Sequence, residues 1–155
     1  MDVGSNRNAA IYQAHSQALV RFATGLVGPS DAADVVASAV LRAMTSKAWP
    51  QVTDHEAYLY RAVANEARSQ YRSTMRRRAR EQRGASREPV YQPDVWPEVL
   101  EAVSRLSPRQ REVVVLTYWE DLSETAVADR LGVNPGSVRR HLGRARQRLR
   151  SLLDE

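Results

Sequence analysis

The sequence contains no cysteine, so disulfide bonds and thiolate metal ligands are excluded. No uninterrupted apolar run approaches the ~18–20 residues of a membrane-spanning helix, and the polar first six residues are unlike a secretory signal peptide. Its three histidines are scattered (His15, His55 and His141), and no nucleophile motif or glycine-rich phosphate loop is recognisable. We therefore expect a cytoplasmic protein that is not an enzyme and uses no metal or other cofactor.

Positive charge is unevenly distributed along the 155 residues, whose net charge is +5. Residues 61–87 contain nine arginines against two glutamates, and residues 139–150 contain six arginines and no acid. Between them, residues 88–129 hold three arginines against nine acids. Two basic blocks separated by an acidic one predict two nucleic-acid contact zones. Arginine supplies 22 of the 23 basic residues, which suits bidentate contacts to phosphate or guanine, although a GC-rich genome would give the same bias.

Two short helical patterns flank a turn in the last third of the chain. Gly132 suits the left-handed position that ends the first helix, Asn134 is a good N-cap, and Pro135 occupies the first helical position of the second. An apolar stripe at helical spacing follows, formed by Val138, Leu142, Ala145, Leu149 and Leu152. The remaining surface of this helix carries six arginines and no acid before Asp154. The pattern predicts a helix-turn-helix that presents a cationic helix to DNA.

Helical patterns also fill most of the remaining chain, and strand-like alternation is absent. We predict a first helix over about residues 9–26, a second helix capped by Ser30, and a third opened by a capping box from Thr53 to Glu56. A further capping box, from Ser107 to Gln110, opens a helix in the second half. The prediction is an all-α fold of two small helical domains, residues 8–79 and 96–155, joined by a flexible linker over 80–95, where glycine, serine and proline occur without periodicity. We expect the three tryptophans to pack in the interior: Trp49, Trp96 and Trp119.

Several motifs together resemble a known family. The C-terminal domain of bacterial RNA polymerase sigma factors is similar to residues 106–116 (LSPRQREVVVL) and to the short motifs that follow at 121–123, 131–133, 136–138 and 144–146. Within this family, the extracytoplasmic-function (ECF) group fits best. Residues 26–43 resemble the family's polymerase-binding helix. Residues 58–65 (YLYRAVAN), with Arg72 and the arginine tract behind them, resemble its promoter-melting helix. The resemblance covers about residues 10–78 and 96–153, in family order, and the short linker points to the ECF group.

The resemblance implies a dissociable specificity subunit that docks on the clamp and flap regions of core RNA polymerase. Its N-terminal domain would recognise the −10 element and capture an unpaired strand, and its C-terminal domain would recognise the −35 duplex. An anti-sigma factor is a further candidate partner. The −35 contacts that it implies are Pro135, Ser137, Arg139, Arg140, His141, Arg144 and Arg146. The −10 contacts that it implies are Tyr58, Arg61, Asn65, Arg68 and Arg72. The core-polymerase contacts that it implies are Asp31, Asp34, Val35, Leu41 and Arg42.

Some of these residues also admit a purely structural interpretation. Tyr58 suits a half-buried position in the core as well as a stacking contact to an unpaired base, and Asn65 is also an ordinary residue for an exposed helix. Asp31 and Asp34 would be stabilised in a first helical turn by the helix dipole alone.

The polymerase-binding segment departs from the family pattern. Ala33, Ala37 and Ser38 stand where Glu, Gln and Glu are common, and Val40 replaces a frequent Phe. This leaves open a second hypothesis, a stand-alone helix-turn-helix regulator that binds DNA but never engages polymerase. A metal-dependent nuclease is a distant third, because no set of converging carboxylates is recognisable.

Overall fold

The computed structural model describes residues 3–78 and 95–154, and every regular element in these two ranges is helical. This confirms the predicted all-α fold. The predicted linker over 80–95 lies, except for its last residue, outside the described residues. In chain order the elements are α1 (Val3–Val27), α2 (Ala32–Thr45), η1 (Trp49–Gln51), α3 (His55–Arg78), α4 (Pro97–Ser104), α5 (Pro108–Val114), η2 (Val115–Trp119), α6 (Glu124–Leu131) and α7 (Pro135–Leu153).

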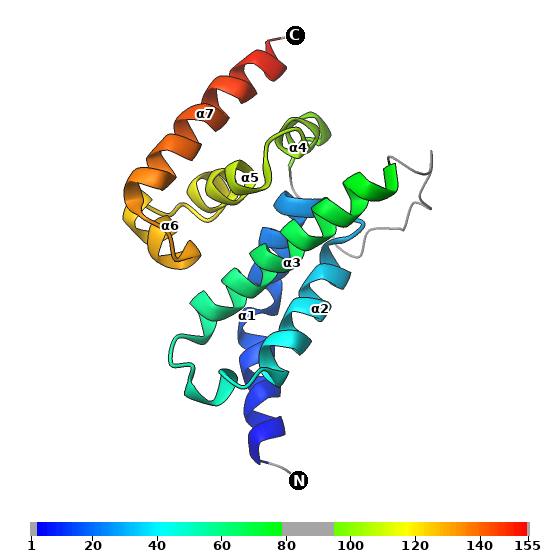
Figure 1. The fold of residues 1–155 in the computed structure, drawn as a ribbon, viewed down its shortest axis with the longest axis vertical. Coiled ribbons are helices and arrows are strands. Elements are labelled where there is room, and N and C mark those ends of the chain that lie inside the picture. Colours follow the sequence, from blue (N-terminus) through cyan, green and yellow to red (C-terminus); the bar gives the residue numbers. More distant parts are fainter. Residues whose placement is uncertain (1–2, 79–94, 155) are drawn as a thin grey trace.

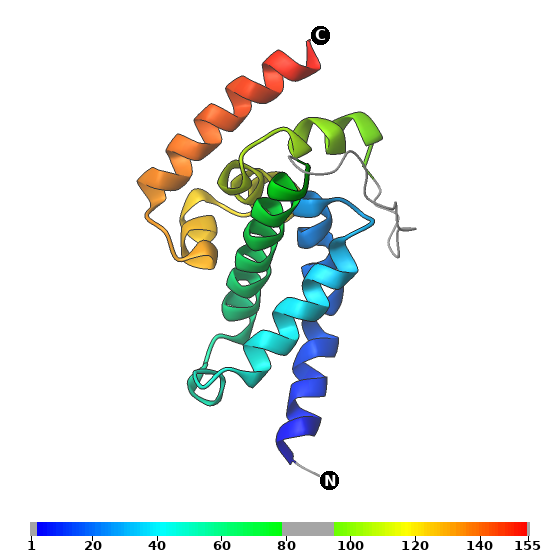
Figure 2. The same cartoon turned by 45° about the vertical axis from the view of Figure 1, so that its right-hand side comes forward.

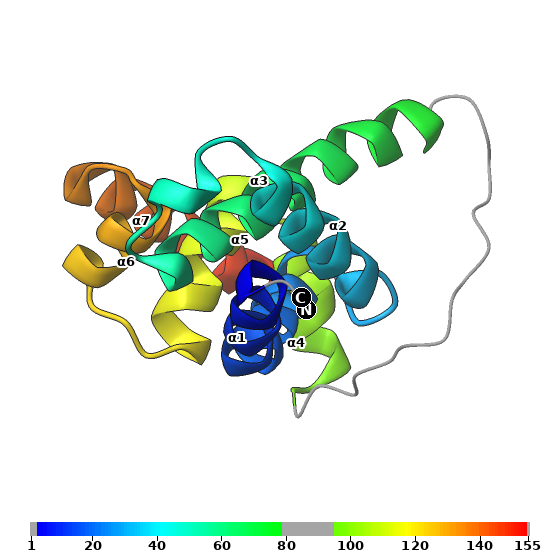
Figure 3. The same cartoon turned by 90° about the horizontal axis from the view of Figure 1, so that it is seen from below.

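Helices α1, α2 and α3 pack side by side as an N-terminal unit (Figures 1 and 3). Three predicted helix starts differ from the structure here, and the first difference is that α1 begins at Val3 and not near residue 9. The N-cap of α2 is Asp31, whose backbone is already helical and whose side chain makes no capping bond, so Ser30 falls one residue too early. Asp54 caps α3 instead of Thr53, because its carboxylate accepts the N–H of Ala57 at 3.0 Å.

The C-terminal unit begins its helices where the sequence predicts. The Ser107–Gln110 capping box is present in both directions. Gly132 ends α6 with a left-handed backbone (φ 68°), and the Asn134 side chain accepts the N–H of Gly136 at 2.7 Å to open α7. The helix-turn-helix is therefore formed by α6 and α7, as its turn chemistry predicts.

A π-helical turn, η2, extends α5 and has no counterpart in the predicted pattern. The N–H of Glu120 reaches the carbonyl of Val115 at 3.2 Å, five residues back. The wider turn keeps Val115 and Leu116 in the core and places Trp119 against α1, where an added Cβ on Gly25 would lie 2.5 Å from the indole ring. A local change of helical pitch thus aligns the end of α5 with the N-terminal unit.

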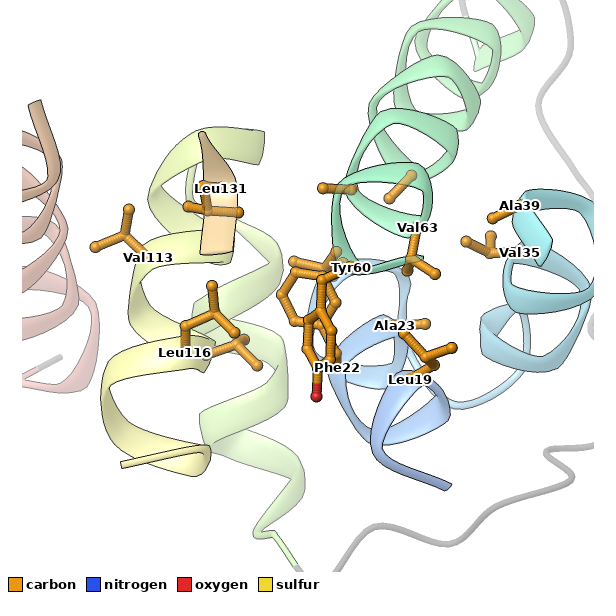
Figure 4. Packing of buried hydrophobic residues seen from close by; sticks show 14 of the residues in the cluster. Leu19, Phe22, Ala23, Val35, Ala39, Tyr60, Val63, Val113, Leu116 and Leu131 are labelled. Atoms are coloured by element: carbon orange, nitrogen blue, oxygen red, sulfur yellow. The ribbon is translucent and has the colours of Figure 1, made fainter. Parts of the chain in front are cut away.

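The two units share one hydrophobic core. Phe22 of α1 and Tyr60 of α3 pack with ring centroids 4.9 Å apart, and Leu116 and Leu131 of the C-terminal unit face them from the other side (Figure 4). All four side chains are at most 7% exposed. The prediction that Trp96 packs in the interior is wrong, because this side chain is 77% exposed. Trp49 is buried and Trp119 is partly buried against the core.

Candidate nucleic-acid interface

Helix α7 is held by its apolar stripe and leaves its basic face outward. Val138, Leu142 and Ala145 are at most 3% exposed and pack toward the rest of the C-terminal unit. Both cartoon views place α7 on the outside of the molecule, with α5 and α6 between it and α3 (Figures 1 and 2). Of the −35 residues expected from the sequence, five are exposed and two half-buried. The exposed ones are Pro135, Arg139, Arg140, Arg144 and Arg146, and the half-buried ones are Ser137 and His141.

The arginines of this face fall into two kinds. Arg139 is paired with Glu124 of α6 at 3.2 Å, and the Arg146 Nε donates to the Tyr118 hydroxyl at 2.6 Å. Arg140 and Arg144 have no ion pair or hydrogen-bond partner among the described side chains. The guanidinium groups of Arg140 and Arg144 are therefore both available to bind a phosphate or a guanine edge.

His141 lies between these arginines. Partial burial, and then the positive charges of Arg109, Arg140 and Arg144, hold its pKa below the ordinary value of 6.5. The imidazole of the free protein is therefore neutral at pH 7, and a nearby phosphate would favour its protonated form.

Four of the five −10 residues expected from α3 line one pocket of about 530 Å³ between α2 and α3. They are Tyr58, Arg61, Asn65 and Arg72. Tyr58 is half-buried, its hydroxyl lies 3.1 Å from the Ser46 hydroxyl, and its ring meets Trp49 edge-on at 5.8 Å. Tyr58 thus packs against Trp49 and also lines the pocket.

The fifth residue, Arg68, points away from this pocket toward the C-terminal unit. It pairs with Glu112 of α5, which is 1% exposed, and it also donates to the Asn65 side chain. Arg109 is a second partner of Glu112 at 3.4 Å. Burial raises the pKa of Glu112, and the two arginines oppose this rise. Sequence reasoning missed Glu112, although it is the only acid in the motif at 106–116 and lies on the apolar side of its helix.

The residues of α2 that were expected to contact polymerase differ in how far their side chains are buried. Leu41 is 67% exposed, Asp34 is exposed, and Arg42 is exposed and paired with Glu66 of α3 at 3.1 Å. Asp31 is half-buried at the start of the helix. Val35 is 3% exposed and belongs to the core, because it lies on the same face of α2 as the buried residues Val36 and Ala39. Its side chain therefore cannot form part of a surface contact.

Two other kinds of site are not found within the described ranges. The described residues contain no group of three or more His, Cys, Asp or Glu placed to hold a metal ion. Among the same residues, no helix is both long and apolar enough to cross a membrane.

Comparison with known proteins gives one consistent result. The chain is 33% identical to the RNA polymerase sigma-E factor of Streptomyces antibioticus, over an alignment that covers 93% of this chain and 83% of that protein. It is also 33% identical to the sigma-E factor of Streptomyces coelicolor, over 88% of this chain and 80% of the relative.

Two solved structures share the fold. One is the sigma factor RpoE in complex with the anti-sigma factor NepR from Bartonella quintana (24% identity, TM-score 0.67, 92% of this chain and 94% of that chain). The other is CnrH in complex with the cytosolic domain of CnrY (26% identity, TM-score 0.65, 97% of this chain and 89% of that chain).

Two family regions cover most of the sequence. Residues 11–77 match the family described as Sigma-70 region 2, and residues 97–149 match Sigma-70, region 4. The stand-alone-regulator hypothesis is not favoured, because region 2 is matched along most of the N-terminal unit. The chain belongs to the sigma-70 family of RNA polymerase sigma factors, in its extracytoplasmic-function group, and it directs core RNA polymerase to promoter DNA.

Proposed function

We propose that the two basic surfaces divide promoter recognition between them, with α7 binding the −35 duplex in the major groove. The support is the geometry of α7: its apolar stripe is buried, and Arg140 and Arg144 project from the opposite side without a partner among the described side chains. Pro135 and Ser137 lie at its first turn, where backbone N–H groups favour a phosphate. Arginine contacts to guanine then provide base preference, and the first turn sets the position on the duplex.

Binding of the −35 duplex is expected to strengthen as the pH falls below neutrality. Phosphates near His141 raise the pKa of its imidazole in the complex above the lowered pKa of the free protein, so binding takes up a proton. The affinity therefore increases as the pH decreases through these two pKa values. Equilibrium titration of duplex DNA at a series of pH values measures this. His141→Gln should remove the dependence, and a wild-type affinity that stays constant over the range would show that no phosphate approaches His141.

We further propose that the pocket between α2 and α3 takes the unpaired −10 strand. The observation that carries this assignment is that Tyr58, Arg61, Asn65 and Arg72 line one pocket. An aromatic ring offers a stacking surface for a base, an amide offers paired hydrogen-bonding groups for a base edge, and arginines neutralise the phosphates. A basic pocket with one aromatic wall is typical of single-strand binding.

Tyr58→Ala is expected to impair promoter opening more than duplex binding. Loss of one base-stacking contact costs about 1–3 kcal/mol, and this contact exists only after the strands separate. Reactivity of unpaired thymines to permanganate, measured on a promoter with the reconstituted holoenzyme, reports opening. A gel-shift titration with the −35 duplex measures duplex binding.

Tyr58→Phe is the matched control, because it keeps the ring and removes only the hydroxyl that lies near Ser46. It should retain most of the opening activity. Equal losses of opening and duplex binding in Tyr58→Ala would instead assign Tyr58 to the stability of the fold.

We propose that the exposed side of α2 contacts the clamp of core polymerase through Asp34, Leu41 and Arg42, and that the C-terminal unit contacts the flap region. The exposure of Leu41, a large apolar side chain, supports this assignment. Residues 8–79 and 96–155 are the corresponding functional domains.

In this proposal the protein performs no covalent chemistry, acts in the cytoplasm where the polymerase works, and has an anti-sigma factor as regulator. Both structural relatives are described in complex with such a regulator or a second protein.

A further inference from the structure

Two arginines of α7 are held through the same atom of the guanidinium group. The Nε of Arg139 donates to the carboxylate of Glu124 at 3.2 Å, and the Nε of Arg146 donates to the hydroxyl of Tyr118 at 2.6 Å. The two arginines are seven residues apart, which is about two helical turns, so they lie on the same side of α7. Each hydrogen bond uses the Nε–H, so the two Nη atoms at the end of each side chain stay available for DNA.

The position of Glu124 follows from the start of α6. It is the first residue of this helix and comes directly after Ser123, whose side chain accepts the N–H of Ala126 at 3.2 Å and caps the helix. Figure 1 shows α6 beside the start of α7, and Arg139 lies near this start, in the part of a recognition helix that meets base edges. A carboxylate of α6 therefore lies at the edge of the surface that we propose for the −35 duplex.

The pair between Glu124 and Arg139 contributes little to the stability of the fold. The side chain of Arg139 is 71% exposed and that of Glu124 is 42% exposed, and ion pairs in such positions are screened by water and salt. A negative charge on this surface also opposes the approach of the DNA backbone. The pair therefore suits a role in selecting which group of the DNA Arg139 contacts.

Charge decides between the two groups that an arginine can bind on duplex DNA. A phosphate on the Nη atoms of Arg139 would be separated from the Glu124 carboxylate only by the guanidinium group, and the two negative charges would repel each other. The major-groove edge of guanine has no net charge and offers two acceptors, O6 and N7, to the two Nη atoms. An arginine paired with an acid therefore favours guanine over phosphate.

The other arginines of this surface differ from Arg139 in their partners. Arg146 is held by the hydroxyl of Tyr118 and lies two turns further along α7, so a phosphate near it meets no carboxylate from its partner. Arg140 and Arg144 have no partner among the described side chains, so their side chains are not oriented before DNA binds. Arg139 combines a fixed orientation with a carboxylate that disfavours phosphate.

We propose that Glu124 is a positioning residue for −35 recognition, which orients Arg139 toward O6 and N7 of one guanine and keeps this arginine from binding phosphate. This inference rests on the proposed function of α7. It assigns part of the base preference to a residue of α6, outside the recognition helix itself. Without Glu124, the side chain of Arg139 can turn to the DNA backbone, where its contact is the same for every sequence.

The experiment first identifies the base that Arg139 contacts. The holoenzyme selects duplexes from a random pool of 24 base pairs, once with the wild-type chain and once with Arg139→Ala. The position at which only the wild type prefers guanine belongs to Arg139. Affinities for the guanine duplex and its three single-base variants then measure the preference, which we expect to be about five- to 150-fold in the wild type.

Glu124→Ala should lower this preference by about two- to tenfold, because the side chain of Arg139 must then be ordered when DNA binds. The variant should bind the guanine duplex more weakly and the three other duplexes no more weakly than the wild type. On those three duplexes the salt dependence should become steeper by about 0.9, as one more phosphate is neutralised. Loss of folding would weaken the binding of all four duplexes and cannot produce this combination.

Two further variants separate orientation from charge. Glu124→Gln keeps an oxygen that accepts the Nε–H of Arg139 but removes the charge, so it should retain most of the guanine preference and still show the steeper salt dependence. Asp129→Ala is the matched control, since it removes one negative charge from an exposed position on the same helix. It should change neither the preference nor the salt dependence.

A double-mutant cycle shows whether Glu124 acts through Arg139. The double variant Glu124→Ala/Arg139→Ala should have the same base preference as Arg139→Ala alone. A further loss in the double variant would mean that Glu124 contacts a base directly, for example the amino group of a cytosine, and would overturn the positioning role.

The remaining outcomes separate this inference from the function on which it rests. The inference is wrong if Arg139→Ala loses no guanine preference, or if Glu124→Ala keeps the full preference. Equal weakening of all four duplexes by Glu124→Ala would also overturn it and would assign Glu124 to the stability of α6, where an acid in the first turn is favourable. Failure of the proposed function has a different signature: Arg140→Ala/Arg144→Ala would then bind the selected duplex as tightly as the wild type.

Discussion

Phe22→Ala is expected to lower the free energy of unfolding by about 3–5 kcal/mol, because it removes a large aromatic side chain from the centre of the core. Phe22 is 0% exposed, its ring packs against Tyr60, and residues of both units surround it (Figure 4). The surrounding helices are held by other contacts and can collapse into the cavity only in part. Chemical denaturation followed by far-ultraviolet circular dichroism measures the change.

Tyr12→Ala is the matched control for this prediction, since it removes an exposed aromatic side chain from the same helix. Its effect should stay within about 0.5 kcal/mol. Because the core is continuous, Phe22→Ala should also shift the transition of Trp119 fluorescence, measured in a background with Trp49→Phe and Trp96→Phe so that the signal reports the C-terminal unit. A loss below about 1 kcal/mol, or an unchanged Trp119 transition, would contradict a single shared core.

Arg140→Ala is expected to weaken binding of the −35 duplex by about 1–3 kcal/mol, or roughly five- to 150-fold, and to relax base preference at one position. Arg140 is exposed on α7 and has no partner among the described side chains, so its guanidinium needs no intramolecular contact to be broken before it meets a base. Titration of duplexes selected from a random pool by the holoenzyme, and of their single-base variants, measures both quantities.

Arg150→Ala is the control on the same helix, because this residue lies in the last turn of α7, far from its first turn. It should cause a small and uniform loss that high salt removes. If Arg140→Ala instead weakens all duplexes equally, Arg140 contacts phosphate, and the base preference comes from another residue of α7.

The C-terminal motif could be predicted almost completely from the sequence, because its signals are local. Gly132, Asn134 and Pro135 determine the turn between α6 and α7 through backbone conformation and capping. The stripe from Val138 to Ala145 determines which side of α7 is buried, and the arginines then occupy the opposite side. None of these features depends on a residue distant in the sequence.

Predictions that depended on neighbours were less successful. Val35 was expected to contact core polymerase and is buried, because its neighbours in the bundle cover that face of α2. Trp96 was expected to pack and is exposed at the start of α4. The turn η2 also escaped prediction, since a single wider turn changes the helical period over only five residues.

The sequence by itself determined an all-α chain with a helix-turn-helix and two basic surfaces, because caps, apolar periodicity and charge are properties of neighbouring residues. Only the tertiary structure decided that the two units share one core, and that Arg61 and Arg68 meet Asp129 and Glu112. The physical reason is that these partners are more than 40 residues apart in sequence. The local sequence around an arginine on a polar helix face does not indicate which distant carboxylate or carbonyl group it will contact.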